Sequence, residues 1–281
     1  MLDILSQAKN AMDAYSTRLR AISANISNVS VDGFKRTDIS FQNLFSKLIS
    51  PGTAAFMNTD GGGTNPLQIG GTVAVSDSSI DFTNGETIEG KQLDIAIGLP
   101  GAMFVISPDG GKTFRYTRNG NFKIINDKMV SDTGMVLYGF RTSNGVAAQK
   151  LEPIDLSGIN YTSSLLSWDE NGFLRLYDSA NTENPYGPAL PYQLAYVTFE
   201  NPSGLRYDNA TTFSQTLSSG NPSTPQVPTV GLLYPRKREK SNVTYSSEVV
   251  DSIEVQRSLD AVQSVIKMAN DSITAFINKL G

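Results

Sequence analysis

The sequence predicts an α+β protein in which long N- and C-terminal helices pair as a coiled coil and are joined by extended stretches to a central antiparallel β domain. Three observations predict this class. Apolar residues recur at heptad spacing at both ends of the chain. Short runs of β-branched and aromatic residues, broken by turn-forming pairs such as Asn-Gly and Asp-Gly, fill the middle. No segment of helical period separates these runs, so a parallel sheet, which needs crossover helices, is not expected.

The N-terminal segment carries one continuous apolar stripe on a polar background. Its members are spaced alternately by three and four residues: Leu5, Ala8, Met12, Tyr15, Leu19, Ile22, Ile26 and Val29. The helix is expected to end near residues 31–33, where Gly33 suits a left-handed cap. We assign residues 1–45 to the N-terminal helix of an inner domain. Residues 46–70, rich in Gly and Pro, are assigned to an extended stretch.

Residues 71–217 are assigned to the central β domain. Asn171-Gly172 lies between two apolar runs and predicts a β-hairpin with a type I′ turn. Trp168, beside this turn, is expected in the core. Residues 218–240 contain Pro222, Pro225 and Pro228, so we expect a returning extended segment there.

The C-terminal segment, residues 241–281, repeats the helical pattern of the N-terminal one. Its stripe comprises Val255, Leu259, Val262, Ile266, Ala269, Ile273, Phe276 and Leu280. Ser246 or Ser247 is a candidate cap, and Glu248 suits the first turn. Val249, Val250 and Ile253 add a second apolar flank. An apolar flank left uncovered on a helical pair predicts that further copies pack alongside.

The composition excludes several classes of chemistry. The chain has 281 residues, no His and no Cys, and its 23 basic and 27 acidic residues give a net charge of −4. Disulfide frameworks, thiolate nucleophiles, His-based metal sites and Ser-His-Asp triads are therefore ruled out. The acidic balance argues against nucleic-acid binding. No apolar run is long enough for a transmembrane helix, and the N-terminus lacks the features of a cleaved signal peptide. We expect no catalytic residue, cofactor or metal, and no membrane insertion.

Two charged features have simple interpretations. Asp169 and Glu170 are adjacent, so on a strand they would point to opposite faces and cannot form a glycosidase pair. Turn chemistry explains them better. The basic run at residues 235–240 is short, so it is interpreted as a solvated segment or a subunit-contact strip rather than a nucleic-acid site.

Two terminal motifs and one central motif resemble a known family. The N-terminal motif comprises Asn25, Asn28, Gly33, Phe34, Lys35 and Arg36. The C-terminal motif comprises Ser241, Asn242, Val243, Gln256 and Arg257. Together with Tyr116-Thr117-Arg118 in the middle, they resemble the signatures of the bacterial flagellar rod and hook axial proteins. Ile26 and Leu259 depart from the family pattern, where an Asn and an aromatic residue are usual. The length favours the distal rod member.

The resemblance implies a structural, non-enzymatic subunit of the periplasm-spanning rod of the flagellar basal body. Such subunits are exported unfolded by the flagellar type III export apparatus, without a cleaved signal peptide. They self-assemble into a helical tube that transmits torque for motility. The implied partners are further copies of the chain, other rod and hook proteins, and the export apparatus, with the bushing rings as a further candidate contact. The terminal helices would then order only in the polymer, as a hypothesis.

Alternatives remain open from the sequence. Within the family, the alternatives to the distal rod member are a hook protein and the other mid-length rod protein. A more distant alternative is a secreted β-rich carbohydrate-binding or carbohydrate-cleaving protein with helical oligomerisation tails. That alternative requires exposed aromatic residues in a groove and a carboxylate pair across it.

Overall fold

The structure is a computed structural model that describes residues 2–44, 47–50, 67–69, 72–143, 146–159, 161, 165–177 and 186–280. The chain divides into two compact units. Unit 1 comprises residues 1–24, 37–78 and 246–281, and unit 2 comprises residues 25–36 and 79–245. The α+β class is confirmed, with a helix at each end and antiparallel strands between them.

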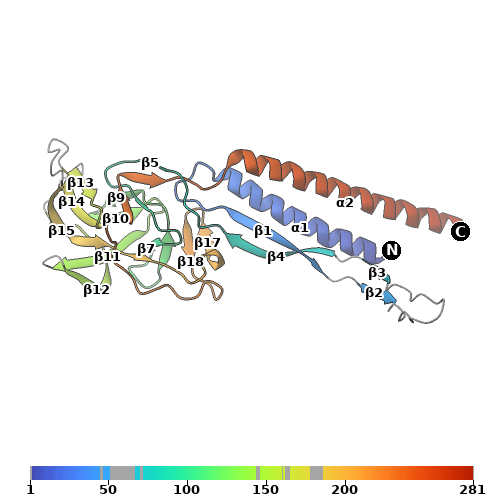
Figure 1. Cartoon of the computed structure of the whole chain (residues 1–281), viewed down its shortest axis with the longest axis horizontal. Coiled ribbons are helices and arrows are strands. Elements are labelled where there is room, and N and C mark those ends of the chain that lie inside the picture. The colour runs from blue at the N-terminus through green and yellow to red at the C-terminus, as the bar shows by residue number, and fades with distance from the viewer. Residues whose placement is uncertain are drawn as a thin grey trace, which may run out of the picture. The chain divides into compact units, whose positions relative to one another are not determined.

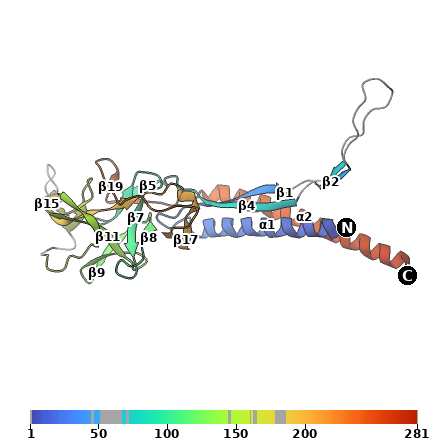
Figure 2. The ribbon, with the colours of Figure 1, turned by 90° about the horizontal axis from the view of Figure 1, so that it is seen from below.

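Unit 1 contains two long helices and four strands. The helices are α1 (Leu2–Ser27) and α2 (Tyr245–Leu280). The strands are β1 (Thr37–Leu44), β2 (Lys47–Ser50), β3 (Leu67–Ile69) and β4 (Thr72–Ile80). β1 pairs with β4, and β2 pairs with β3. Both views show α2 running alongside α1 in the opposite direction, with the β1–β4 ribbon along them, and the end of α2 extending past the start of α1 (Figures 1 and 2).

Helix α1 ends at Ser27, earlier than the expected end near residues 31–33. Three successive turns follow it, in which the amides of Asn28, Val29 and Val31 bond to carbonyls three residues earlier. Ser and Asn residues here compete with helix continuation, because their side chains bond to nearby backbone. Gly33 does take the left-handed conformation, with φ +71°, but it does so beyond these turns rather than directly at the helix end.

Unit 2 contains the central β domain and its flanking short strands. The strands of the main sheet are β7 (Met103–Ser107), β8 (Arg115–Thr117), β9 (Phe122–Ile125), β10 (Lys128–Ser131), β11 (Val136–Ser143), β12 (Val146–Pro153), β13 (Leu166–Trp168), β14 (Phe173–Tyr177), β15 (Tyr186–Leu194), β16 (Tyr196–Val197), β17 (Arg206–Asn209) and β18 (Thr212–Ser214). Its longest path runs β13-β14-β15-β11-β7-β8-β18-β17. A 3₁₀ turn spans Pro202–Gly204.

Four short strands form two further antiparallel pairs in unit 2. β6 (Ile95–Ile97) pairs with β19 (Leu233–Pro235), and β5 (Thr87–Glu89) pairs with β20 (Lys237–Glu239). The sequence predicted an extended returning segment where β19 and β20 lie. The structure gives this segment strand partners far away in sequence, because Leu233 pairs with Ile97 and Glu239 pairs with Thr87. No local pattern specifies such pairs.

Strand β7 is central because both of its faces are buried. Phe104 and Ile106 belong to one apolar cluster, and Met103 and Val105 belong to a second. Successive side chains of a strand point to opposite faces, so β7 separates the two cores. Its uninterrupted apolar sequence, all five residues of which are buried, follows from this position.

The predicted hairpin at Asn171-Gly172 forms, and Trp168 is fully buried, but the type I′ turn is wrong. β13 pairs with β14, and only Gly172 of the two turn residues has a positive φ, at +76°. A type I′ turn needs positive φ at both central residues. The loop is longer, because the Asp169 carboxylate accepts the amides of Asn171 and Phe173. Asn126 and Asp127, with φ +51° and +61°, instead form such a two-residue turn between β9 and β10.

Candidate assembly surface

No residue of the predicted N-terminal stripe is exposed. Ala8 and Ile22 are buried, and the rest are half-buried: Leu5, Met12, Tyr15, Leu19, Ile26 and Val29. The exposed positions of α1 are small or polar, among them Lys9, Asn10 and Arg20. The stripe therefore marks the covered face of α1, while its role as an assembly seam stays a prediction.

The C-terminal stripe also lies on the covered side of its helix. Val255 is buried, and Leu259, Val262, Ile266, Ala269 and Ile273 are half-buried. The side chains of Phe276 and Leu280 lie outside the described residues. Over the same turns, nearly all other side chains beyond Val255 are exposed. One narrow strip of α2 is therefore covered within the monomer.

An aromatic contact fixes α1 against the β1–β4 ribbon. The ring of Tyr15 meets that of Phe41 on β1 edge-on, with ring centroids 5.5 Å apart. The guanidinium of Arg18 lies 5.4 Å from the centroid of the same Phe41 ring. One member of the predicted stripe thus packs on a strand. Phe41 was missed because residues 1–45 were assigned to the helix, although Ile39 and Phe41 alternate with polar residues as in a half-buried strand.

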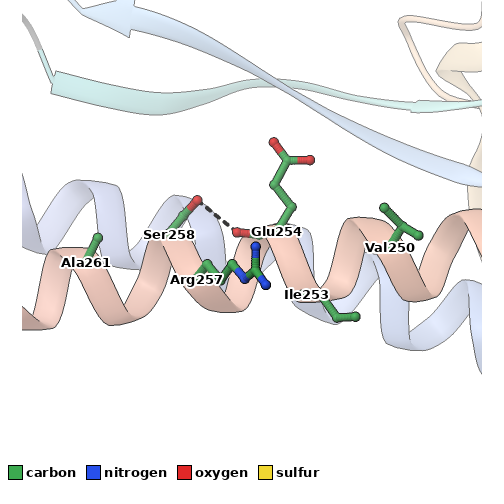
Figure 3. A pocket seen from close by; sticks show the side chains of 6 residues that line it. All are labelled: Val250, Ile253, Glu254, Arg257, Ser258 and Ala261. Atoms are coloured by element: carbon green, nitrogen blue, oxygen red, sulfur yellow. Dashed lines mark hydrogen bonds between the residues drawn. The ribbon is translucent and has the colours of Figure 1, made fainter.

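The outward face of α2 carries a second apolar strip, which is uncovered. Val250, Ile253 and Met268 are exposed, at 63%, 47% and 60% respectively. At 100° per residue they lie on the opposite side of the helix from Val255. Figure 3 shows the upstream part of this face, where Val250, Ile253, Glu254, Arg257, Ser258 and Ala261 line an open groove of about 410 Å³. We call these six residues and Met268 the outer strip.

Two opposite charges lie within the outer strip. Ser258 donates a hydrogen bond of 3.0 Å to the backbone carbonyl of Glu254 and not to its carboxylate (Figure 3). Within the described part of the chain, neither Glu254 nor Arg257 forms a side-chain ion pair. The strip therefore combines uncovered apolar side chains with one free anion and one free cation.

The terminal signatures are only partly brought together. Two groups of signature residues lie close together in unit 2, namely residues 33–36 and 241–243. Gln256 and Arg257, in contrast, are exposed on α2. Asn242 Oδ1 accepts the Arg36 amide at 2.8 Å, and Phe34 stacks on Tyr207 with centroids 5.6 Å apart. Asn25 is buried in the last turn of α1, and Asn28 is half-buried directly after the helix.

A buried ion cluster lies among these signature residues. Glu239 Oε1 accepts Lys35 Nζ at 2.6 Å, and Oε2 accepts Arg118 Nε at 2.9 Å. The side chains of Lys35 and Arg118 are 0% exposed, and that of Glu239 is 3% exposed. Glu239 was missed in the sequence, because it lies in a run of charged residues that is typical of a solvated segment.

Burial lowers the pKa of the Lys35 ammonium and of the Arg118 guanidinium, because a medium of low dielectric constant disfavours charged forms. The nearby Glu239 carboxylate raises both values and so opposes this effect. All five N–H donors of Arg118 have acceptors, namely Glu239, the Asn84 side chain and the carbonyls of Leu99, Ala102 and Ile97. Arg118 is therefore a structural ion, fully satisfied.

Two further grooves contain no carboxylate pair among their described lining residues. One, of about 720 Å³, is lined by Phe114, Tyr138 and Glu152 among others. Another, of about 650 Å³, contains Glu200. Asp169 instead binds Arg175 at 2.6 Å and organises its turn, as predicted.

Among the described residues, no group of three or more His, Cys, Asp or Glu side chains is placed to hold a metal ion. Neither of the two long helices contains, in its described residues, an apolar stretch of the length that a membrane span requires.

Comparison with known proteins gives consistent matches. The family described as "Flagella basal body rod protein" matches residues 5–35. Flagellar basal-body rod protein FlgG of Buchnera aphidicola from Schizaphis graminum is 30% identical over 267 residues, covering 92% of this chain and 93% of that protein. FlgG of Bacillus subtilis is 28% identical over 284 residues, covering 99% of each chain. The flagellar hook protein FlgE of Helicobacter mustelae is 33% identical over 171 residues, but these make up only 36% of that protein.

These matches show that the protein is a structural protein of the axial part of the bacterial flagellum. The chain belongs to the family of flagellar basal-body rod proteins and resembles FlgG, the distal rod protein, over nearly its full length. The similarity to hook proteins is partial. The resemblance inferred from the terminal signatures is therefore confirmed.

Proposed function

We propose that this rod subunit assembles with copies of itself into a helical tube that transmits torque, and that its two terminal helices form the assembly seam. In this proposal α1 and α2 pair as a coiled coil through the two predicted stripes. The inner domain then comprises residues 1–45 and 241–281. Residues 46–70 and 218–240 are the connecting segments, and residues 71–217 are the outer β domain.

The single observation that carries the proposal is the outer strip of α2. Its inward stripe is already covered in the monomer, whereas Val250, Ile253 and Met268 are left to solvent. A neighbouring subunit that covered these side chains would gain roughly 1 kcal/mol from each, about half of what full burial contributes. Glu254 and Arg257 would set the register through complementary charges on the neighbour. Head-to-tail contacts of this kind generate an open helical polymer.

We further propose that the partners are other rod and hook proteins and the export apparatus, with the bushing rings as a candidate outer contact. The chain would lie in the periplasm-spanning rod, would reach it without a cleaved signal peptide, and would not act as an enzyme. The similarity to flagellar basal-body rod proteins over nearly the whole chain supports this interpretation over a carbohydrate-cleaving protein.

Polymerisation of the purified protein tests the proposal. Met268→Asp places a charge on the outer strip, and Leu217→Asp is the matched control, because Leu217 is fully exposed in unit 2. We expect Met268→Asp to abolish pelletable polymer and motility, with Leu217→Asp close to wild type in both. Equal behaviour of the two variants would contradict the assignment of the strip.

A sugar-binding assay separates the distant alternative. A carbohydrate-binding protein with oligomerisation tails would retain sugar binding in Met268→Asp. Binding of the wild-type protein to an oligosaccharide array would therefore support the carbohydrate-binding alternative. Polymer formation without any sugar binding would support the structural role.

A further inference from the structure

The buried ion cluster ties together three segments of unit 2 that are far apart in sequence. Glu239 lies 204 residues from Lys35 and 121 residues from Arg118. Its carboxylate also accepts the Gly85 amide at 3.0 Å, and its backbone carbonyl accepts the Gly33 amide at 2.8 Å. One residue therefore holds the segment after α1, the segment after β4 and strand β20.

The uncharged side chain of Asn242 joins the same three segments by hydrogen bonds close to Glu239. Asn242 Oδ1 accepts the Arg36 amide at 2.8 Å, while Asn242 Nδ2 donates to the Asp81 carbonyl at 2.8 Å. Lys35 Nζ and Asn242 Nδ2 both donate to the Thr83 carbonyl, at 2.6 Å and 3.2 Å. We call residues 33–36, 81–86 and 238–242, with Arg118, the junction.

The place of the junction in the chain gives it a distinct role. The chain crosses between the two units after residues 24, 36, 78 and 245. The last three crossings lie within a few residues of a junction segment, and the first leads through residues 25–32 into the junction segment 33–36. Any force that reaches unit 2 along the backbone from residues 37–78 or 246–281 therefore arrives first at the junction and only then at the β sheet.

We propose that the junction is a mechanical clasp, in which Glu239 locks Lys35 and Arg118 so that the core strands of unit 2 are not peeled apart when the chain is loaded through its crossings. The inference deepens the proposed function, since it names how a torque-transmitting subunit keeps its outer unit folded. The buried ion pairs of Glu239 with Lys35 and Arg118 suit this role. Separating Glu239 from its two cations under load would leave buried charges without partners, which is a steep local barrier.

A clasp and an ordinary core contact make different predictions. Loss of a core contact weakens unit 2 whichever way it is pulled. Loss of a clasp weakens it mainly along the axis that runs through the crossings. The direction of pulling therefore distinguishes them.

Single-molecule pulling on the full chain provides this test, and the absence of native Cys makes the attachment points unique. Ala24→Cys with Ser246→Cys loads unit 2 through the junction. Lys112→Cys with Ser157→Cys, at two exposed positions, loads the sheet instead. Glu239→Gln is compared with Glu86→Gln, because Glu86 forms an ion pair with Lys240 at 2.9 Å that belongs to the same junction but is exposed to solvent.

We expect Glu239→Gln to shorten the folded lifetime under load by about a hundredfold or more along the junction axis, since two buried cations lose their counter-ion. Along the sheet axis the change should be several times smaller. Glu86→Gln should change either lifetime by no more than about fivefold. Equal losses on both axes, or a Glu239→Gln effect no larger than that of Glu86→Gln, would overturn the clasp.

Asn242→Ala keeps the test decisive if Glu239→Gln does not fold. It removes the neutral hydrogen bonds to Arg36 and Asp81 without leaving a buried charge. The same preference for the junction axis is expected, with a smaller effect, and an equal effect on both axes would refute the proposal. These measurements use single molecules, so their outcome is independent of polymerisation, and failure of polymer formation would contradict only the proposed function.

Discussion

The same substitution on opposite faces of α2 should separate monomer stability from assembly. Val255 is 2% exposed on the covered stripe, and Ile253, two residues earlier, is 47% exposed on the outer strip. Val255→Asp loses roughly 1.5–3 kcal/mol of burial and places a carboxylate in apolar surroundings, for a total cost of about 4 kcal/mol or more. Ile253→Asp should leave the free energy of unfolding of the monomer within about 0.5 kcal/mol of wild type.

Assembly should respond in the opposite way. Covering the exposed half of Ile253 contributes about 1 kcal/mol, and burying an aspartate there instead costs at least about 2 kcal/mol. The sum, about 3 kcal/mol, raises the critical concentration for polymerisation by about a hundredfold. Circular dichroism melts measure the first effect, and sedimentation of polymer over a concentration series measures the second. A critical concentration for Ile253→Asp within threefold of wild type would refute this reasoning about the outer strip.

Three further predictions concern unit 2. Hydrogen bonds, chiefly from the Thr113 amide, lower the pKa of Asp109 to about 2, so its stabilising effect is present above pH 4 and is lost as the pH falls towards 2. The difference in Tm between wild type and Asp109→Asn should therefore shrink from pH 4 to pH 2, and a constant difference would argue against it. Gly33→Ala should cost several kcal/mol, because φ is +71° and a Cβ would lie 2.5 Å from the Asn119 amide nitrogen. Gly110→Ala, with φ +73° and open space, should cost only about 1 kcal/mol in the same urea titrations. Limited proteolysis should leave a resistant fragment that retains Lys35 and Glu239, since both are buried in unit 2; a fragment trimmed to residues 71–217 would contradict this.

The helical ends and the β character of the middle were predictable because their signals are local. A stripe at heptad spacing specifies which face of a helix is covered, and Val255, Leu259 and Val262 lie on that face. Turn residues such as Gly172 mark where strands reverse. The type of turn was not predictable from Asn171-Gly172 alone, because the Asp169 side chain accepts two loop amides and selects a longer loop.

The junction was not predictable, because its energetics depend on contacts across most of the chain. Glu239 lies between Arg238 and Lys240, and such a run usually faces solvent. Only the fold shows that its carboxylate is buried between Lys35 and Arg118. Lys35 and Arg118 were identified by resemblance, but the reason for their positive charges, a shared buried counter-ion, came from the structure.

The outer strip was partly predictable. Val249, Val250 and Ile253 were identified as a second apolar flank from the sequence. Val250 and Ile253 prove to be exposed, whereas Val249 is half-buried. Met268 was not identified, because a single apolar residue outside a stripe gives no periodic signal. The groove between Val250 and Ala261 depends on side-chain positions that sequence spacing does not specify.

Photo-crosslinking in assembled rods tests the central claim most directly. A photoreactive benzoylphenylalanine at position 253 would report what covers the outer strip, with the same probe at the exposed position 217 of unit 2 as the control. If the chain assembles through this strip, irradiated basal bodies should yield a ladder of self-adducts from position 253 that is absent from the soluble monomer and from position 217. Irradiated basal bodies with no self-adduct at position 253 would contradict assembly through the outer face of α2.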